Sequence, residues 1–578
     1  MINKQFRNPW LWLALGLAAV YIRGLFIDVM DVDAAQYASI AMEMSQNGSW
    51  LQVFHRGADY LDKPPLVFWL SAAMFKVFGL SNWAYKLPSV LAALMGVWAT
   101  YRFTLLFYGV DKARYAAFIL ASCMGLMVIS NDVRTDTLLL GFSTCAIWQG
   151  AEYLAYRRWK NLLAAFFFVG LAMLAKGPIG LVMTAFGLGA HLLIKREWRS
   201  IFQWQWLPGL VVTALVLAPM CWGLWQQFDL HPEKLVNDRH GVSGLRFFFW
   251  EQSFGRITGE NVWKNDASGF YFLHVYLWAF LPWCLLLPYA LWKHLRAVVE
   301  VVAAGASSDG VTGSHPVTRS TGTSNPGNRE FITLGAFLLT FIALSQSQYK
   351  LPHYIFVTLP WAAILLASTL EQPKRWQWLV LYFIGFLTMV LCLAVLFFFF
   401  PEGAWWLKIL FMGGLAVLLW RIWQHPFPAD SNKLVQRGVW LMVLFGFVLN
   451  FHFYARLLPY QCPARVAQFA RAQGIPPEKM YFFQSSSHAM DFYNSRIMPN
   501  LGTPELARQR ALSENGIFVF TTLDGQNILK EAGLHAVEKA RFPHFQVALL
   551  KPKFLNPATR ESTLGTYLLL EIPAPGTK

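Results

Sequence analysis

Charged side chains are scarce in this sequence. Only 14% of its 578 residues are Asp, Glu, Lys or Arg, whereas a typical soluble domain carries about 25%. The mean hydropathy is +0.38 and 56% of the residues are hydrophobic, which excludes an ordinary soluble chain. Apolar runs of about 20 residues, long enough to cross a hydrocarbon core of about 30 Å, recur from Trp10 to Phe453. These features predict an integral membrane protein.

Cysteine is also rare, and its positions exclude some kinds of site. Five of the six cysteines lie in or beside apolar runs, and Cys462 stands alone in the C-terminal tail. This distribution indicates neither a disulfide framework nor a Cys-rich metal site. The first 26 residues resemble a signal peptide but lack a small-residue cleavage site after the apolar run. We therefore expect them to remain as the first membrane span.

A basic domain is missing as well, although the formal net charge is +16. Lys and Arg are scattered between apolar runs, without an aromatic platform for bases, so the charge does not indicate nucleic-acid binding. Membrane topology explains it better, because cytoplasmic loops are enriched in Lys and Arg. The connections near residues 4–7, 112–114, 157–160, 195–199, 293–296, 374–375 and 421–437 carry this charge. With an odd number of spans, they all fall on one side, which we expect to be cytoplasmic.

The hydropathy pattern predicts an α-helical polytopic protein with about thirteen transmembrane helices. The expected centres lie near residues 18, 97, 120, 145, 168, 186, 215, 281, 340, 361, 388, 412 and 446. We expect a transmembrane catalytic domain over residues 1–455, including external loops 28–89 and 226–269. The Gly/Ser/Thr-rich composition of residues 304–328 predicts a flexible cytoplasmic linker. The N-terminus is then cytoplasmic, in a bacterial inner membrane.

The tail, residues 456–578, is more polar and is expected on the opposite, periplasmic face. Short β-rich stretches at 480–484, 516–522, 546–551 and 566–572 alternate with helical stretches. This alternation predicts a small α/β domain.

Two polar segments stand out in the first external loop. DVDAAQYASIAMEM, residues 31–44, has apolar residues at helical spacing, as in a helix at the membrane interface, and Asp33 would begin that helix. YLDKPPL, residues 60–66, sets Asp62 and Lys63 against two prolines, which places both charges on irregular backbone.

Other connections on the same expected face carry further polar residues: SNDVRTD at 130–136, LAKGPIG at 174–180, FFFWEQSFGR at 247–256 and SQYKLPHY at 347–354. Together the five connections present both signs of charge: Asp33, Asp62, Lys63, Asp132, Asp136, Lys176, Glu251, Arg256, Lys350, His353 and Tyr354. A phosphate near hydrocarbon needs cationic partners, while carboxylates can orient or deprotonate a nucleophile. The mixture predicts a site for a lipid-borne anionic substrate.

The combination of DxxQYA at 33–38, YLDKPPL, LAKGPIG and Lys350-Leu-Pro-His-Tyr354 resembles the GT-C membrane glycosyltransferases, especially the aminoarabinose (lipid A) transferases and the protein O-mannosyltransferase superfamily. The resemblance covers nearly the whole membrane region. It implies sugar transfer from a polyprenyl (undecaprenyl) monophosphate donor to an acceptor on the outer face. The acceptor could be lipid A, another envelope lipid or glycan, or an exported protein.

The resemblance also implies residue roles. Asp33 matches the acid before the tyrosine and is expected to act as catalytic base or to orient the acceptor; Asp62 is the second candidate catalytic carboxylate. Lys63 is expected to pair with the donor phosphate, with Arg256, Lys176, Lys350 and Tyr354 as further phosphate contacts. Tyr37, Tyr60, Asp136 and Glu251 are the expected substrate-positioning residues.

Two positions depart from the pattern of the lipid A class, which places Arg where this chain has Gln36 and Glu where it has Asp62. A Gln cannot neutralise an acceptor phosphate as Arg does, which puts lipid A specificity in doubt.

Asp62 and Glu251 could share a divalent metal, but two carboxylates without a His partner are a weak signal. No other cofactor is indicated. A lipid-linked sugar flippase is the rival hypothesis, although a transporter is expected to carry ionisable residues near the bilayer midplane, where these spans carry almost none. An envelope scaffold protein would explain the tail but not Asp33 and Lys63. The sugar and the oligomeric state are not predicted.

Overall fold

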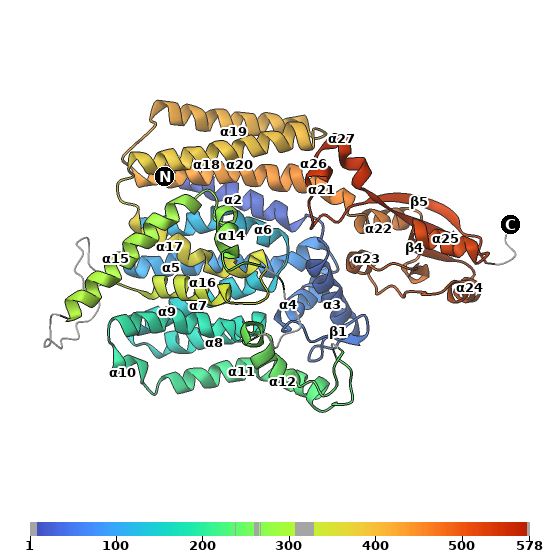
Figure 1. The fold of residues 1–578 in the computed structure, drawn as a ribbon, viewed down its shortest axis with the longest axis horizontal. Coiled ribbons are helices and arrows are strands. Elements are labelled where there is room, and N and C mark those ends of the chain that lie inside the picture. The colour runs from blue at the N-terminus through green and yellow to red at the C-terminus, as the bar shows by residue number, and fades with distance from the viewer. Residues whose placement is uncertain (1–7, 237, 259–264, 266, 307–328, 575–578) are drawn as a thin grey trace.

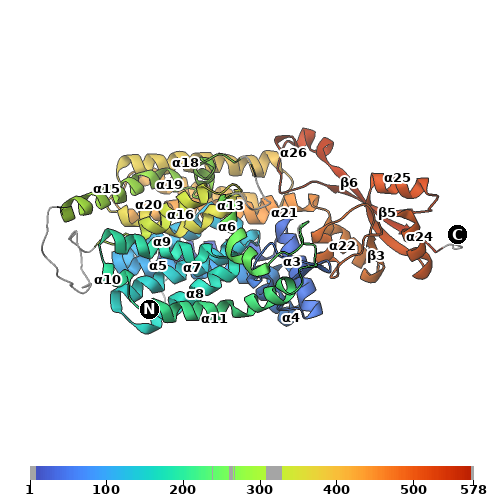
Figure 2. The same cartoon turned by 60° about the horizontal axis from the view of Figure 1, so that its bottom comes forward.

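The computed structural model describes residues 8–306, except for 237, 259–264 and 266, and residues 329–574. Long helices run side by side in one bundle, and a smaller lobe containing a β-sheet projects from one end of it (Figures 1 and 2). Lys4, Arg7 and most of the linker predicted at 304–328 lie outside the described residues.

Seven helical stretches in the described part of the chain are long and apolar enough to cross a membrane: Asn82–Ser122, Trp159–Lys176, Trp198–Asp229, Pro352–Thr369, Arg375–Phe399, Trp405–Gln424 and Ser431–Tyr460. Four apolar helices are shorter: Pro9–Leu25, Leu66–Phe78, Ile179–Ile194 and Ile332–Ser345. The protein is therefore a multi-pass helical membrane protein. The predicted count of thirteen spans stays a prediction.

Helix α5 (Asn82–Ser122) contains two of the predicted span centres, near residues 97 and 120. The two halves meet at Gly109, whose φ of 81° interrupts the helical backbone. Only glycine adopts this region without steric cost, so the chain bends here and continues directly.

Helix α19 (Trp405–Gln424) shows how the bundle meets lipid. It carries exposed tryptophans near both ends, among them Trp405 and Trp423. Eighteen residues of helix rise about 27 Å, close to the thickness of a hydrocarbon core. The two tryptophans therefore have the separation of the aromatic belts at the two membrane surfaces.

The end of the bundle next to the lobe holds the loop that the sequence analysis predicted to be external, residues 28–89. Helix α3 (Asp33–Asn47) begins at Asp33 as predicted, but it is buried along most of its length instead of lying at the lipid interface. It packs against α4 (Leu66–Phe78) and the lobe helix α23 (His488–Tyr493), and Tyr85 of α5 donates to its Ala34 carbonyl. The sequence analysis did not predict α4. A two-stranded hairpin, β1 (Phe54–His55) and β2 (Ala58–Asp59), connects α3 to the YLDKPPL segment.

Three further helices end or begin at this face of the bundle. Helix α7 (Thr135–Tyr156) starts just after the extended Arg134, and α8 (Trp159–Lys176) ends at Lys176. Gly177 follows with a φ of 86° and lets the chain turn sharply into α9 (Ile179–Ile194). Further helices are α11 (Trp206–Leu224), α12 (Gly244–Arg246), α13 (Gly255–Thr258), α14 (Tyr271–Ala279), α16 (Ile332–Ser345) and α17 (Leu359–Thr369).

We call residues 461–572 the C-terminal lobe. Its sheet has the strand order β3-β4-β6-β5, with β3 parallel to β4 and the other pairs antiparallel. The strands are β3 (Met480–Phe482), β4 (Ile517–Thr522), β5 (Val537–His544) and β6 (Gly565–Ile572); the longer helices are α22 (Pro463–Ala472), α24 (Pro504–Ser513) and α25 (Leu523–Glu531).

Three of the four predicted strands coincide with β3, β4 and β6. The strand predicted at 546–551 is wrong, because these residues form a turn in which Leu549 and Leu550 are exposed. The fourth strand is β5, an edge strand in which half of the side chains are polar and half are exposed, so it gave no alternating apolar signal.

The lobe and helix α15 (Leu287–Ala306) lie at opposite ends of the molecule, and the lobe adjoins the end that carries α3 and α4 (Figure 2). The two polar segments singled out in the sequence, residues 31–44 and 60–66, thus lie at the end of the bundle that adjoins the lobe.

Candidate functional site

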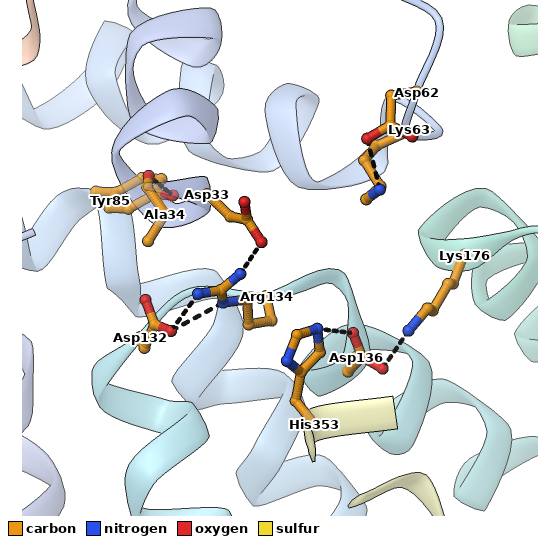
Figure 3. Close-up of polar contacts among 10 residues, drawn as sticks. All are labelled: Asp33, Ala34, Asp62, Lys63, Tyr85, Asp132, Arg134, Asp136, Lys176 and His353. Atoms are coloured by element: carbon orange, nitrogen blue, oxygen red, sulfur yellow. Dashed lines mark hydrogen bonds and ion pairs between the residues drawn. The ribbon is translucent and has the colours of Figure 1, made fainter. Parts of the chain in front are cut away.

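A cavity of about 360 Å³ opens among α3, the hairpin, and the segments before α7 and α17. Eight of the predicted site residues line it: Asp33, Tyr37, Tyr60, Asp62, Lys63, Asp136, Lys176 and Tyr354. They come from five separate parts of the chain. Four of the five connections that the sequence analysis grouped on one face therefore converge on one hollow, as Figure 3 shows for its charged residues.

One side of the cavity is formed by Asp33 and its partner Arg134. The Arg134 guanidinium donates to the Asp33 carboxylate, and its Nε donates to Asp132 Oδ2 at 2.8 Å (Figure 3). Burial works to lower the pKa of Arg134, but Asp132 and Asp33 raise it above its ordinary value. Arg134 is thus a permanent cation between two carboxylates. The side chain of Asp33 is 41% exposed, so it stays accessible from the cavity.

Asp136, the second residue of α7, lies across the cavity from Asp33. Its carboxylate is 2% exposed and accepts from the ammonium of Lys176. His353 Nε2 lies 3.7 Å from its other oxygen. Lys176 Nζ also lies 3.7 Å from the centre of the Tyr354 ring. Asp136 thus holds Lys176 over the face of Tyr354.

The YLDKPPL segment supplies the roof of the cavity. Asp62 and Lys63 lie on irregular backbone, as predicted, and their side chains pair at 2.6 Å. Pro64 and Pro65 then lead into α4, which starts at Leu66. Gln252, which is buried, donates to the main-chain carbonyl of Asp62. This bond fixes the corner that presents Lys63.

Two tyrosines stand behind the charged residues: Tyr37, which is buried, and Tyr60, which is partly buried. Tyr37 and Tyr60 both pack edge-on against Phe68, with ring centres 5.7 and 5.8 Å away. Burial raises the pKa of both phenols well above the ordinary value, so both stay protonated. Within the described part of the chain, the Tyr60 hydroxyl has no hydrogen-bond partner. It is a donor available to a substrate oxygen.

A second, mostly apolar pocket of about 180 Å³ adjoins the first. Lys63, Lys176 and Tyr354 line both cavities. Its remaining walls are mainly apolar: Leu139, Pro178, Ile179, Val182, Phe186, Phe254, Ala343, Leu344 and Val357. Two cations and a phenol therefore mark the boundary between a polar chamber and an apolar one.

Two predicted site residues do not line either cavity. Lys350 donates to the carbonyl of Ala267 at 2.9 Å. Tyr349 and Leu351 face the cavity instead, because successive side chains of an extended segment point to opposite sides. Glu251 lies 3.6 Å from Arg246 Nε, and its neighbour Gln252 faces the site. The side chain of Arg256 lies outside the described residues.

The contacts of Asp62 and Glu251, the two carboxylates that could share a divalent metal, do not indicate a shared metal site. Asp62 and Glu251 each have a cationic neighbour of their own. Among the residues that the structure describes, no group of three or more His, Cys, Asp or Glu side chains is arranged to hold a metal ion.

Sequence reasoning missed Arg134 and gave no role to Asp132 or His353. All three occur in segments that the analysis quoted, and Arg134 is the one basic residue of SNDVRTD. Its position beside two acids and before a span was the available signal.

Similar proteins are found by family model, by sequence and by fold. Residues 62–223 match the family model described as dolichyl-phosphate-mannose-protein mannosyltransferase. The chain is 25% identical over 466 residues to an undecaprenyl phosphate-alpha-4-amino-4-deoxy-L-arabinose arabinosyl transferase of Edwardsiella ictaluri, covering 77% of this chain and 72% of that protein. A protein of the same description from Pseudomonas aeruginosa is 25% identical over 384 residues, which are 64% of this chain and 61% of that protein.

The fold is similar to the crystal structure of ArnT from Cupriavidus metallidurans bound to undecaprenyl phosphate. The TM-score is 0.71 at 20% identity, covering 98% of this chain and 99% of that one. The apo structure of the same protein gives a TM-score of 0.70 at 19% identity. The two likenesses extend over the bundle and the lobe alike.

Proposed function

We propose that the chain is a membrane glycosyltransferase of the GT-C superfamily that transfers a sugar from a polyprenyl monophosphate, such as undecaprenyl phosphate, to an acceptor hydroxyl on the periplasmic face. The observation that carries this proposal is the junction of the two cavities. A lipid-linked sugar needs an apolar channel for its isoprenoid chain, a polar chamber for its sugar, and cations between them for its phosphate. Lys63, Lys176 and Tyr354 occupy that boundary.

The donor phosphate is placed between Lys63 and Lys176, with the Tyr354 and Tyr60 hydroxyls within the same cavity. In the substitution, the bond between the anomeric carbon and the phosphate oxygen breaks, and the electron pair leaves with the phosphate. The growing negative charge on the phosphate is stabilised by the two ammonium groups. Their carboxylate partners Asp62 and Asp136 hold them in place before the donor binds.

The acceptor is placed at the Asp33 side of the cavity. As the acceptor oxygen bonds to the anomeric carbon, Asp33 accepts the hydroxyl proton as general base. Two carboxylates, Asp33 and Asp132, flank the one guanidinium of Arg134, and Gln36 beside them is neutral. This surplus of negative charge disfavours an acceptor phosphate and favours a hydroxyl, whether on a glycan, a lipid or an exported protein.

The membrane orientation belongs to the same proposal. The basic connections between spans lie at the end of the bundle that carries α10 (Trp198–Ile201) and α15, away from the lobe (Figure 1). By the positive-inside rule this end is cytoplasmic. The cavity and the C-terminal lobe are then periplasmic, the N-terminus is cytoplasmic, and an odd number of spans, thirteen by hydropathy, connects them.

The test is transfer of labelled sugar from a defined polyprenyl-phosphate donor, with the purified protein in lipid. We expect Asp33→Asn and Lys63→Ala to lower kcat/KM at least 100-fold, the usual range for loss of a base or of charge stabilisation at a leaving group. Asp524→Asn and Lys530→Ala, at exposed positions of α25, are matched controls expected to retain activity.

Equal rates for all variants would overturn the site assignment. Labelled donor that crosses the bilayer without forming product would instead identify a flippase.

A further inference from the structure

The short α2–α3 segment, residues 26–32, connects α2 (Pro9–Leu25) to Asp33, and its backbone is held by the C-terminal lobe. Gln461 Oε1 accepts from the Asp31 N–H at 2.9 Å, and Gln461 Nε2 donates to the Val29 carbonyl at 2.8 Å. One side-chain amide thus bonds the segment as a neighbouring β-strand would. Gln461 is 2% exposed, so water does not compete for these bonds.

A second residue of the lobe holds the same segment. The Tyr493 hydroxyl, at the end of α23, accepts from the Val29 N–H at 2.8 Å. It donates to Asn82 Oδ1 at 3.2 Å, at the start of α5. The segment is therefore fixed between the lobe and the bundle.

These bonds act directly on the first turn of α3. The Met30 carbonyl accepts from the Ala35 N–H at 3.1 Å, and Tyr85, from α5, donates to the Ala34 carbonyl at 2.6 Å. Asp33 lies between these anchor points as the first residue of the helix. Moving the segment would therefore move the Asp33 carboxylate relative to Arg134.

The lobe also holds the far end of α3 and the hairpin. Gln46 donates to the Ser495 carbonyl at 2.8 Å. Arg56, in the turn of the hairpin, makes a two-pronged ion pair with the buried Asp491, with Nε–Oδ2 2.9 Å and Nη2–Oδ1 3.2 Å. Both chain segments that form the cavity roof and the Asp33 side thus contact the same lobe.

We infer that the C-terminal lobe is a positioning element of the catalytic centre, and that Gln461 and Tyr493 are the positioning residues through which it fixes Asp33. This inference rests on the proposed role of Asp33 as base. The residues themselves contact neither cavity, so they do not bind substrate.

Hydrogen–deuterium exchange of the full chain in lipid nanodiscs tests whether Gln461 and Tyr493 hold the α2–α3 segment, and it requires no turnover. Gln461→Met keeps the size of the side chain and removes both bonds. We expect exchange over residues 28–36 to become at least 10-fold faster. Gln473→Met, at an exposed position of the same lobe, is the matched control and should leave that exchange unchanged. Unchanged exchange in Gln461→Met would overturn the inference.

A double-mutant cycle tests the functional link. We expect Gln461→Met to lower kcat about 10-fold and to change the donor KM less than 2-fold. In an Asp33→Asn background, the same substitution should lower kcat no further, because the group that it misplaces is already absent. Equal loss in both backgrounds, or a loss confined to KM, would overturn the inference.

Tyr493→Phe removes the bonds of the hydroxyl to Val29 and Asn82 but leaves both Gln461 bonds in place, and it serves as the milder second variant if Gln461→Met does not fold. It is expected to give the same pattern, with about a 3-fold loss of kcat. Failure of the wild-type protein to transfer any sugar would overturn the proposed function. The exchange experiment would still show whether the lobe holds the α2–α3 segment.

Discussion

The ammonium of Lys176 lies 3.7 Å from the centre of the Tyr354 ring, where the polar and apolar cavities meet. A cation over an aromatic face gains about 0.5–2 kcal/mol, and here the buried Asp136 holds the same cation from another side. The Lys176 ammonium is thus held in position before a phosphate binds. This preorganisation costs no rearrangement at the moment when the leaving group develops charge.

Tyr354 should therefore contribute through both its ring and its hydroxyl. We expect Tyr354→Phe, which keeps the ring beneath Lys176, to lower kcat/KM for the donor about 10-fold through loss of a hydrogen bond to phosphate. Tyr354→Leu removes the ring as well and should lower it about 100-fold. Steady-state kinetics with varied donor measure both. Tyr156→Phe, at an exposed tyrosine, is the control; equal activity of the Phe and Leu variants would contradict a role for the ring.

Arg134 offers a test of the acceptor chemistry. If it orients Asp33 as the base, Arg134→Gln should lower kcat about 30-fold with little change in the acceptor KM, and Arg134→Lys should restore part of the loss. If it binds an acceptor phosphate instead, the loss should fall on the acceptor KM. Kinetics with varied acceptor separate the two. Arg508→Gln, on the outside of α24, is the matched control.

The contact between the lobe and the hairpin should depend on pH. Burial raises the pKa of the Asp491 carboxyl from its ordinary value to about 6, although the charge of Arg56 opposes the rise. Because the folded pKa is above the unfolded one, the folded protein binds this proton more tightly. Its contribution to stability is present at low pH and is lost as the pH rises from about 4 to about 6.

Asp491→Asn removes this titration. A rise of about two units corresponds to roughly 3 kcal/mol, so the stability of Asp491→Asn relative to wild type should increase by up to that amount between pH 4.5 and 7.5. Thermal unfolding in detergent at several pH values measures it. The comparison is made as a difference because His55 and His488, whose pKa burial lowers to about 4, and Asp31, whose pKa burial raises to about 6, also titrate there. A constant difference across the range would contradict the prediction.

Local sequence signals predicted the parts of the site that depend on backbone chemistry. An acid at a helix start and a pair of prolines each restrict the backbone within a few residues, so the placement of Asp33 and the irregular YLDKPPL corner could be predicted. Four of the five connections that span parity grouped on one face also meet at one cavity. These inferences need no knowledge of how helices pack.

Pairing across the fold could not be predicted in this way. Arg134 reaches Asp33 over a separation of 101 residues, and Gln461 reaches Asp31 over 430. Neither partner is determined by the local pattern, and a neutral amide in a tail gives no hydropathy signal at all. The direction of Lys350 depends on a two-residue alternation within a loop, which a shift of one position reverses.

Glu43 holds the hairpin that precedes Lys63. Its two carboxylate oxygens accept from the N–H groups of Arg56 at 2.7 Å and Gly57 at 2.9 Å. Both residues have positive φ, 56° and 75°, as in the tight turns that favour hairpins. The Glu43 side chain is 5% exposed, so its removal would leave two backbone donors without their acceptor. Each such loss costs about 1–3 kcal/mol.

We therefore expect Glu43→Ala to lower the free energy of unfolding by about 2–4 kcal/mol and to reduce transfer at least 10-fold, since the hairpin leads directly to the corner that presents Lys63. Glu43→Gln retains one acceptor oxygen and should show about half of each effect. Thermal unfolding and transfer assays on the same samples measure the two losses. A Glu43→Ala protein with wild-type kcat/KM would show that the hairpin does not position Lys63, whatever its stability.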